Sequence, residues 1–186
     1  MTATKDRLWT VDEYHRMIET GILTDSDRVE LLEGRIIQMS PQLPPHAATT
    51  QRIDRYLQNR LRGLADIRVQ LPITLSTSEP EPDIAVVRID PNGYAEHHPG
   101  SREILLLIEV AHTTLDKDRE EKAFAYARAN IADYWILALS SRQVYIERNP
   151  TASGYQGETI LNSEASLAPL AFPALEIPFS ELFLPL

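Results

Sequence analysis

Apolar side chains recur at steps of three and four residues over residues 46–62, and this spacing predicts an amphipathic helix that stops at a glycine. A shorter helix is predicted before it, over residues 11–20, where Thr10 and Glu13 have the spacing of a capping box and Gly21 can end the helix. Between them, two alternating segments flank a Glu-Gly pair and predict a β-hairpin over 28–39.

Five extended segments are predicted in the rest of the chain. They cover residues 67–75, 84–87, 104–110, 134–139 and 143–148. The third of these is apolar at both alternating positions, which is typical of a strand covered by helices on both faces of its sheet. The last two flank a short polar turn, which predicts that they pair with each other.

A third helix is predicted over residues 115–129, where the sequence is charged first and alanine-rich later. Thr113 or Thr114 can serve as its N-cap, and Asn130 can take the left-handed conformation that ends a helix. The proline- and leucine-rich tail, 163–186, is predicted to pack as irregular structure with one short helix.

The order of these elements predicts an α/β (α+β) fold, in which a mixed sheet is flanked by helices on both sides. A chain of 186 residues is long enough to bury its own core, so we expect a single domain over 1–186. The longest apolar run, 104–108, is too short to cross a bilayer, so we expect no membrane insertion and a cytoplasmic protein.

Composition narrows the chemistry further. The chain has no cysteine, which excludes disulfides, thiolate metal sites and a cysteine nucleophile. Its net charge of −9 argues against a broadly basic nucleic-acid-binding surface, so DNA would have to meet a local basic patch or a bound metal. The glycine-rich phosphate loop, the GxSxG elbow and the HExxH motif are absent from the sequence, which disfavours P-loop, serine hydrolase and zincin functions.

Two acidic residues stand at the ends of predicted strands. Asp83 follows Pro82 at the start of one strand, and Glu109 lies near the end of the next. Strand parity lets the two carboxylates converge at one edge of the sheet if these strands are neighbours. With a main-chain carbonyl such as that of Val110, they would form a hard-oxygen site for Mg²⁺ or Mn²⁺.

A lysine follows on the predicted third helix. This helix could bring Lys122 back to the edge of the sheet where the two acids converge. There Lys122 would orient an attacking water or neutralise the charge of a phosphoryl-transfer transition state. Each residue also has a structural alternative. Lys122 could pair with Asp118 on a solvated helix face, and Glu109 could pair with an arginine. Asp83 could serve only as a hydrogen-bond partner for the backbone at a turn or strand end.

Five motifs together resemble a known family. They are RVELLEG at 28–34, PDIAVV at 82–87, LIEV at 107–110, EK at 121–122 with YARA at 126–129, and DYWI at 133–136. In this order they resemble the Uma2 (DUF820) family of restriction endonuclease-like proteins, which belongs to the PD-(D/E)XK nuclease-like superfamily. The resemblance extends from about residue 10 to residue 183.

This resemblance implies a restriction-endonuclease-like fold and Mg²⁺-dependent cleavage of DNA by a homodimer. It makes Asp83 and Glu109 metal ligands, adds Glu30 as the upstream acid, and directs His46 at the start of the second helix into the site. In the superfamily the catalytic lysine stands two residues after the second acid, where this chain has alanine. The role is therefore filled only if Lys122 takes it from the helix.

Two other functions stay open at this point. The fold could serve as a catalytically inactive binding or regulatory module, which would suit the net charge and the alanine at the usual lysine position. It could also hydrolyse a smaller phosphate ester, for which an acidic protein without a basic groove is better suited. Glu30 judged by its own strand pattern would simply belong to an outward face.

Overall fold

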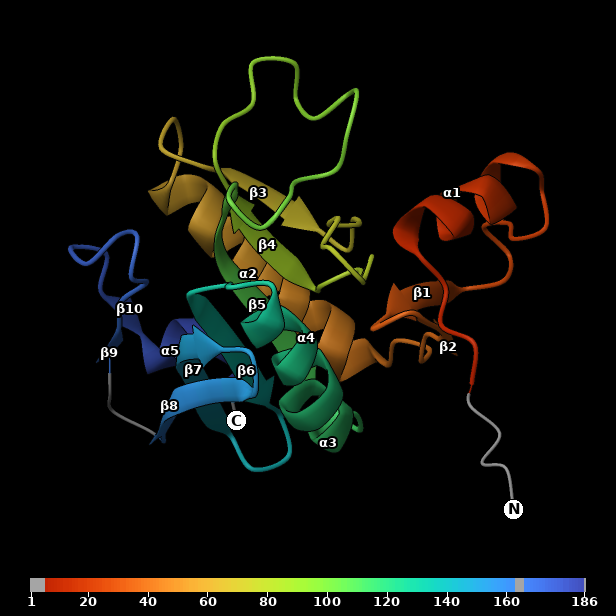
Figure 1. The fold of residues 1–186 in the computed structure, drawn as a ribbon. Coiled ribbons are helices and arrows are strands. Elements are labelled where there is room, and N and C mark those ends of the chain that lie inside the picture. Colours follow the sequence, from red (N-terminus) through yellow and green to blue (C-terminus); the bar gives the residue numbers. More distant parts are fainter. Residues whose placement is uncertain (1–5, 163–165, 186) are drawn as a thin grey trace.

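A six-stranded mixed sheet forms the centre of the protein in a computed structural model that describes residues 6–162 and 166–185 (Figure 1). Its strands are β3 (Asp66–Val69), β4 (Ile84–Val87), β5 (Ile104–Ala111), β6 (Asp133–Ala138), β7 (Gln143–Thr151) and β8 (Gly154–Leu161), in that order across the sheet. Strands β5 and β6 run parallel, and the other neighbouring strands are antiparallel. The predicted mixed sheet is confirmed.

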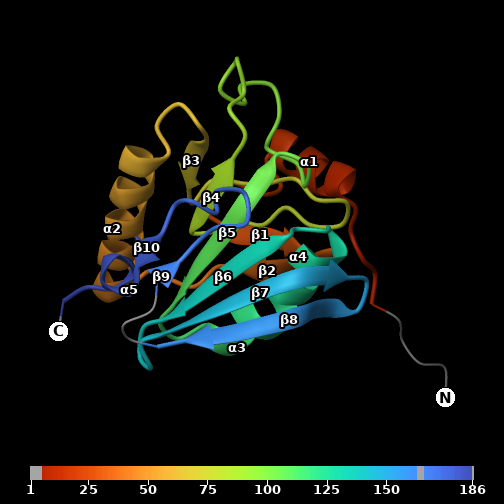
Figure 2. The same cartoon turned by 90° about the vertical axis from the view of Figure 1, so that its left-hand side faces the viewer.

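Helices cover both faces of this sheet, as Figure 2 shows from the side. Helix α2 (Pro44–Arg60) and the short α5 (Phe179–Leu182) lie on one face, and α4 (Ala123–Arg128) lies on the other. Successive residues of β5 alternate between the two cores: Leu106 packs with α2 and Leu107 packs with α4. Burial on both sides explains why both faces of this strand are largely apolar, with Glu109 as its one charged residue.

The N-terminal elements form a separate unit beside the sheet, on the right in Figure 1. Helix α1 (Val11–Glu19) starts with the predicted capping box: Thr10 Oγ1 accepts the Glu13 N–H at 3.2 Å, and Glu13 accepts the Thr10 N–H at 3.0 Å. Strands β1 (Val29–Leu32) and β2 (Arg35–Gln38) form the predicted hairpin as a two-stranded sheet of their own.

Two boundaries and one strand differ from the predictions for a clear physical reason. Strand β3 ends at Val69 because Gln70 has a left-handed backbone (φ 52°), so the predicted extension to residue 75 is wrong. Helix α2 begins at Pro44, two residues earlier than predicted, because proline is tolerated in the first turn of a helix. Strand β8 was not predicted, because it is an edge strand with no fully buried residue and without an apolar pattern.

The predicted helix over 115–129 is interrupted. It consists of α3 (Leu115–Lys117), a π-helical turn η1 (Asp118–Lys122) and α4. In this turn the N–H of Ala123 reaches the carbonyl of Asp118, five residues back. The left-handed Asn130 (φ 62°) follows the helix as expected.

The tail contains more structure than predicted. Besides the expected short helix α5, it forms strands β9 (Ser166–Leu167) and β10 (Ile177–Pro178), which pair with each other. Residues 163–165 and 186 of the predicted tail lie outside the described residues. Across 6–162 and 166–185, none of the helices combines the length and the apolar character that a bilayer crossing requires.

Candidate active site

Asp83 and Glu109 lie opposite each other at one edge of the central sheet. The antiparallel register pairs Ile84 of β4 with Ile108 of β5. Asp83 precedes Ile84 and Glu109 follows Ile108, so this register brings the two acids opposite each other. The N–H of Val110 donates to Asp83 Oδ2 at 2.8 Å, and the N–H of Asp83 lies 3.4 Å from Glu109 Oε2. The convergence expected from strand parity is therefore confirmed.

Lys122 reaches this pair from the π-helical turn. Its Nζ lies 2.7 Å from Glu109 Oε1 and 3.9 Å from Glu30 Oε2, and the residue is only 6% exposed. The alternative that Lys122 lies on a solvated helix face is wrong. Burial of a lysine requires compensating charge, which the carboxylates of Glu109 and Glu30 provide.

Glu30 lies inside the protein, not on an outward face. It is 2% exposed, its Oε1 accepts a hydrogen bond from Lys117 Nζ at 3.0 Å, and its Oε2 accepts the Glu81 N–H at 3.2 Å. The hairpin packs against the segment before β4 through a bridge between Leu31 and Glu79. This packing turns the polar position of β1 towards the central sheet.

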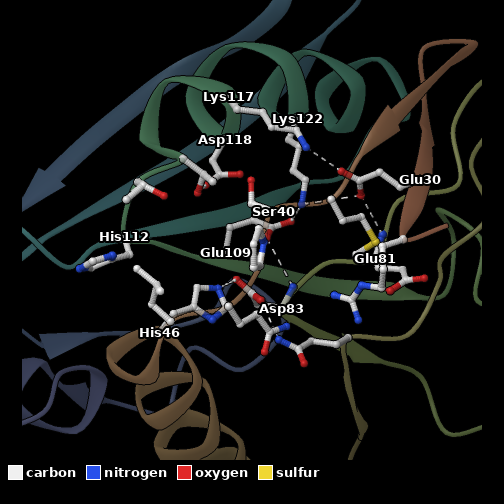
Figure 3. A pocket seen from close by; sticks show the side chains of 18 residues that line it. Glu30, Ser40, His46, Glu81, Asp83, Glu109, His112, Lys117, Asp118 and Lys122 are labelled. Carbon is white, nitrogen blue, oxygen red and sulfur yellow. Dashed lines mark hydrogen bonds and ion pairs between the residues drawn. The ribbon is translucent and has the colours of Figure 1, made fainter. Parts of the chain in front are cut away.

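His46 and Gln70 both contact the carboxylate of Asp83, and Figure 3 shows His46 beside it. His46, in the first turn of α2, has its Nε2 2.9 Å from Asp83 Oδ2. Gln70 Nε2 donates to Asp83 Oδ1 at 3.1 Å. The other ring nitrogen of His46, Nδ1, is buried and has no hydrogen-bond partner among the described residues. His46 thus lies in the site, as the family resemblance implied.

Asp118 adds another buried carboxylate to the site, at the start of the π-helical turn. It is 3% exposed and accepts a hydrogen bond from Thr114 Oγ1 at 2.7 Å. Thr114 stands at the predicted N-cap position, but its hydroxyl bonds this carboxylate and caps no backbone N–H. Asp118 therefore faces the same interior as Lys122 without forming an ion pair within 4 Å of it.

Sequence reasoning missed several residues that contact the candidate site. Gln70 follows the end of β3, and that end is set by the left-handed backbone of Gln70 itself. No sequence signal therefore marks Gln70 as a site residue. Lys117 reaches Glu30 across 87 positions of sequence, a contact that local patterns cannot show. Tyr126 could have been found, because it stands four residues after Lys122 and so shares its helix face. Its hydroxyl donates to Glu109 Oε1 at 2.9 Å.

These side chains surround a cavity of about 210 Å³ (Figure 3). Five acidic residues line it, against three cations that are charged at neutral pH, Arg28, Lys117 and Lys122. If all are ionised, two negative charges are left over, which is the charge that one divalent cation would compensate. The oxygen-rich lining also suits a hard cation such as Mg²⁺ or Mn²⁺.

The described residues contain no group of three or more histidine and carboxylate side chains placed to hold a metal ion. A cation here would therefore rely on Asp83 and Glu109 together with main-chain oxygen and water, which is how proteins commonly hold Mg²⁺. In an extended strand the N–H and C=O of one residue point to the same side. The N–H of Val110 donates to Asp83, so the carbonyl of Val110 faces the side of Asp83 as well.

The charges of the site are strongly coupled. Burial raises the pKa of Glu109 well above its usual range, and although Lys122 opposes this shift, the nearby charges of Asp83 and Asp118 add to it. Burial disfavours the charged form of Lys122, but the adjacent carboxylates raise its pKa and keep it protonated. For Asp83 burial is outweighed by the hydrogen bond and charge of His46, which lower its pKa. The site thus holds one firmly ionised acid beside one that resists ionisation.

Comparison with known proteins agrees with this fold. A solved structure described as "a putative nuclease belonging to DUF820" from Anabaena variabilis matches with a TM-score of 0.71 and 18% identity, over 94% of this chain and 97% of that chain. No curated protein matches. The family Uma2, described as "Putative restriction endonuclease", matches residues 11–180. Since that match spans nearly the whole chain, the protein belongs to the Uma2 family.

Proposed function

We propose that this protein is a divalent-metal-dependent endonuclease that hydrolyses phosphodiester bonds of DNA. The observation that carries the proposal is the geometry around Glu109: it faces Asp83 across two strands and has Lys122 Nζ 2.7 Å from its Oε1, at the wall of a cavity. Membership of a restriction endonuclease-like family supports a nuclease-like function in general. The metal ion, the DNA substrate and the roles of individual residues are our proposal.

Asp83, Glu109 and the Val110 carbonyl would hold Mg²⁺ or Mn²⁺. When bound, such a cation makes a water molecule more acidic and stabilises negative charge on phosphoryl oxygens. His46 and Gln70 keep the Asp83 carboxylate oriented through one hydrogen bond to each of its oxygens. Because Asp83 is held ionised, it offers a ready anionic ligand.

Lys122 would act on the reacting groups themselves. Its protonated Nζ would orient the attacking water and neutralise the charge that develops on the phosphorus-bound oxygens. Water would lose one proton to solvent and form the new P–O bond, the bond to the leaving sugar oxygen would break, and that oxygen would take up a proton from solvent. Glu30 would hold the two lysines in place, since it contacts Lys117 at 3.0 Å and Lys122 at 3.9 Å.

DNA is the substrate that we favour, because a cation held by Asp83 and Glu109 can supply the local basic contact that a protein of net charge −9 needs. Arg28 is exposed, lines the cavity and forms no ion pair within the described part of the chain. We further propose a homodimer, since two sites related by twofold symmetry would cut both strands of a duplex. We place the protein in the cytoplasm, which suits a chain without cysteine.

A binding and cleavage experiment tests this function. Mn²⁺ and Mg²⁺ are titrated calorimetrically into the wild type, Asp83→Asn and Glu109→Gln, and each protein is incubated with plasmid and with single-stranded DNA. Glu120→Gln is the matched control, because Glu120 is an exposed acid of the same π-helical turn that does not line the cavity. We expect both site variants, but not the control, to lose metal binding and cleavage.

The remaining outcomes separate the alternatives. A wild type that binds neither cation would reject an enzymatic function of this kind and favour a binding or regulatory module. Metal binding without DNA cleavage, but with hydrolysis of a small phosphodiester such as bis(p-nitrophenyl) phosphate, would favour a hydrolase of smaller esters. The cavity is small, about 210 Å³, and this size is the observation that favours a hydrolase of smaller esters as the second candidate function. Sedimentation velocity of the wild type tests the dimer.

A further inference from the structure

One oxygen of Glu109 accepts two hydrogen bonds from the same helix. Lys122 Nζ donates to Oε1 at 2.7 Å, and Tyr126 OH donates to the same atom at 2.9 Å. The other oxygen, Oε2, has only the long contact of 3.4 Å from the N–H of Asp83 among the described residues. The two oxygens of one carboxylate therefore have different environments: one is bound to the helix, and one is close to Asp83.

Tyr126 has little freedom to move. Its side chain is completely buried, and its ring packs edge-on against Tyr134, with centroids 4.9 Å apart and planes at 79°. The hydroxyl of Tyr134 donates to the carbonyl of Asp118 at 3.0 Å, the same carbonyl that accepts the Ala123 N–H in the π-helical turn. The tyrosine pair thus connects the strand that carries Tyr134 to the turn that carries Lys122.

The two donors to Oε1 differ in one respect that concerns catalysis. In the proposed function Lys122 contacts water and phosphate during the reaction, so its contact with Glu109 weakens when it does so. Tyr126 is completely buried and does not itself line the cavity. Its hydroxyl can therefore hold Oε1 throughout the reaction.

We propose that Tyr126 is a positioning residue for Glu109, whose hydroxyl fixes Oε1 against the helix so that Oε2 stays directed towards Asp83 and the metal position. The inference rests on the proposed function for the identity of the metal site. It assigns a role to a residue that touches neither substrate nor metal. Partners of this kind, one step removed from a metal, typically change metal affinity by about 10-fold to 100-fold when they are lost.

The test compares the buried Tyr126 with the partly buried Tyr155. Tyr126→Phe removes the hydroxyl and keeps the ring, whereas Tyr155→Phe removes a hydroxyl that donates to the Ile131 carbonyl at 2.8 Å, outside the site. Calorimetry with Mn²⁺ should give a dissociation constant about tenfold higher for Tyr126→Phe and within twofold of the wild type for Tyr155→Phe. Circular dichroism confirms that both variants are folded.

A second measurement needs no metal. The side-chain carboxyl ¹³C resonance of Glu109, assigned with Glu109→Gln, should shift in Tyr126→Phe and stay in place in Tyr155→Phe. Unchanged Mn²⁺ affinity in Tyr126→Phe would overturn the inference while the proposed function stands. If the wild type binds no Mn²⁺, the proposed function fails, and the resonance then decides alone: a shift supports the positioning role, and no shift overturns it.

Discussion

Lys122 and Glu109 meet 2.7 Å apart in the interior of the protein, and both residues are almost completely removed from water. Removing one partner of such a pair leaves an uncompensated buried charge, which typically costs about 3–5 kcal/mol of stability. We therefore expect Lys122→Met to lower the free energy of unfolding by roughly that amount. Urea unfolding followed by circular dichroism measures it.

Lys117→Met serves as the control for this prediction. Lys117 also contacts a buried acid, Glu30, but its side chain is 24% exposed, so its replacement should cost about 1 kcal/mol. The double variant Lys122→Met with Glu109→Met should recover part of the loss, because it leaves neither charge alone. A cost below about 1 kcal/mol for Lys122→Met would contradict the importance of this pair.

Two facing glutamates on the central sheet predict a pH dependence of stability. Glu147 and Glu158 lie opposite each other on β7 and β8, and burial of Glu147 together with its contact to Glu158 raises the pKa of Glu147 to about 7. The native state then holds a proton that the unfolded chain releases above its ordinary pKa of 4.5. The contribution of Glu147 is therefore present below pH 4.5 and is lost as the pH rises through 7.

Glu147→Gln should remove this dependence. We expect the variant to unfold at a temperature a few degrees higher than the wild type at pH 8, and to show a smaller decrease in stability between pH 5 and pH 8. Thermal unfolding at several pH values is the measurement, and Glu120→Gln, an exposed acid, is the control. Parallel pH profiles for wild type and Glu147→Gln would disprove the shift.

Arg28 predicts the salt dependence of DNA binding. In the proposed function its exposed guanidinium contacts a phosphate, so Arg28→Ala should weaken binding and reduce the slope of log K against log salt by about 0.9. Arg35→Ala on the same hairpin is the control, because Arg35 is exposed but does not line the cavity. Fluorescence anisotropy at several salt concentrations gives both slopes, and equal slopes would exclude the phosphate contact.

The hairpin turn predicts a glycine requirement. Gly34 has a φ of 75°, and a Cβ at this position would lie 2.8 Å from Leu8 Cβ and 3.1 Å from the Trp9 carbonyl. Gly63 has a similar φ of 74°, but a Cβ there would meet no atom within 4 Å. Both alanine variants carry the strain of the left-handed region, about 1–2 kcal/mol.

Only Gly34→Ala adds a steric clash, so we expect it to lose roughly 1–3 kcal/mol more than Gly63→Ala. Chemical denaturation of the two variants provides the comparison. Similar losses would mean that the N-terminal segment moves aside without cost, and that its contact with the hairpin is loose.

Local patterns were sufficient for most of the fold, because burial imposes a period on each element that packs in the core. The parity argument for Asp83 and Glu109 succeeded for the same reason: a strand fixes which side chains share a face. The edge strand β8 was missed, because none of its residues is fully buried and they carry no such period. The end of β3 depends on a single left-handed residue, Gln70, which has no counterpart in the hydrophobic pattern.

The burial of Glu30 could not be derived from its own strand. Alternation indicates that a side chain lies on one face of a hairpin, but not which face the rest of the protein covers. That choice was made by the packing of β1 on the segment before β4, between residues about 50 positions apart. The π-helical turn was also beyond local reasoning, because the residues of this segment, DREEK, would form a regular α-helix equally well.

The π-helical turn contains one residue more than a regular turn would, and this addition changes the phase of the helix. Each residue of an α-helix rotates the chain by about 100°, so in a regular helix Thr114 and Tyr126 would point about 120° apart. The π-helical turn absorbs one residue, and both side chains therefore reach carboxylates of the same interior. Deleting the exposed Glu120 would convert the turn to a regular one and leave the residues after it facing the site, whereas an added residue that the turn could not absorb would rotate them away.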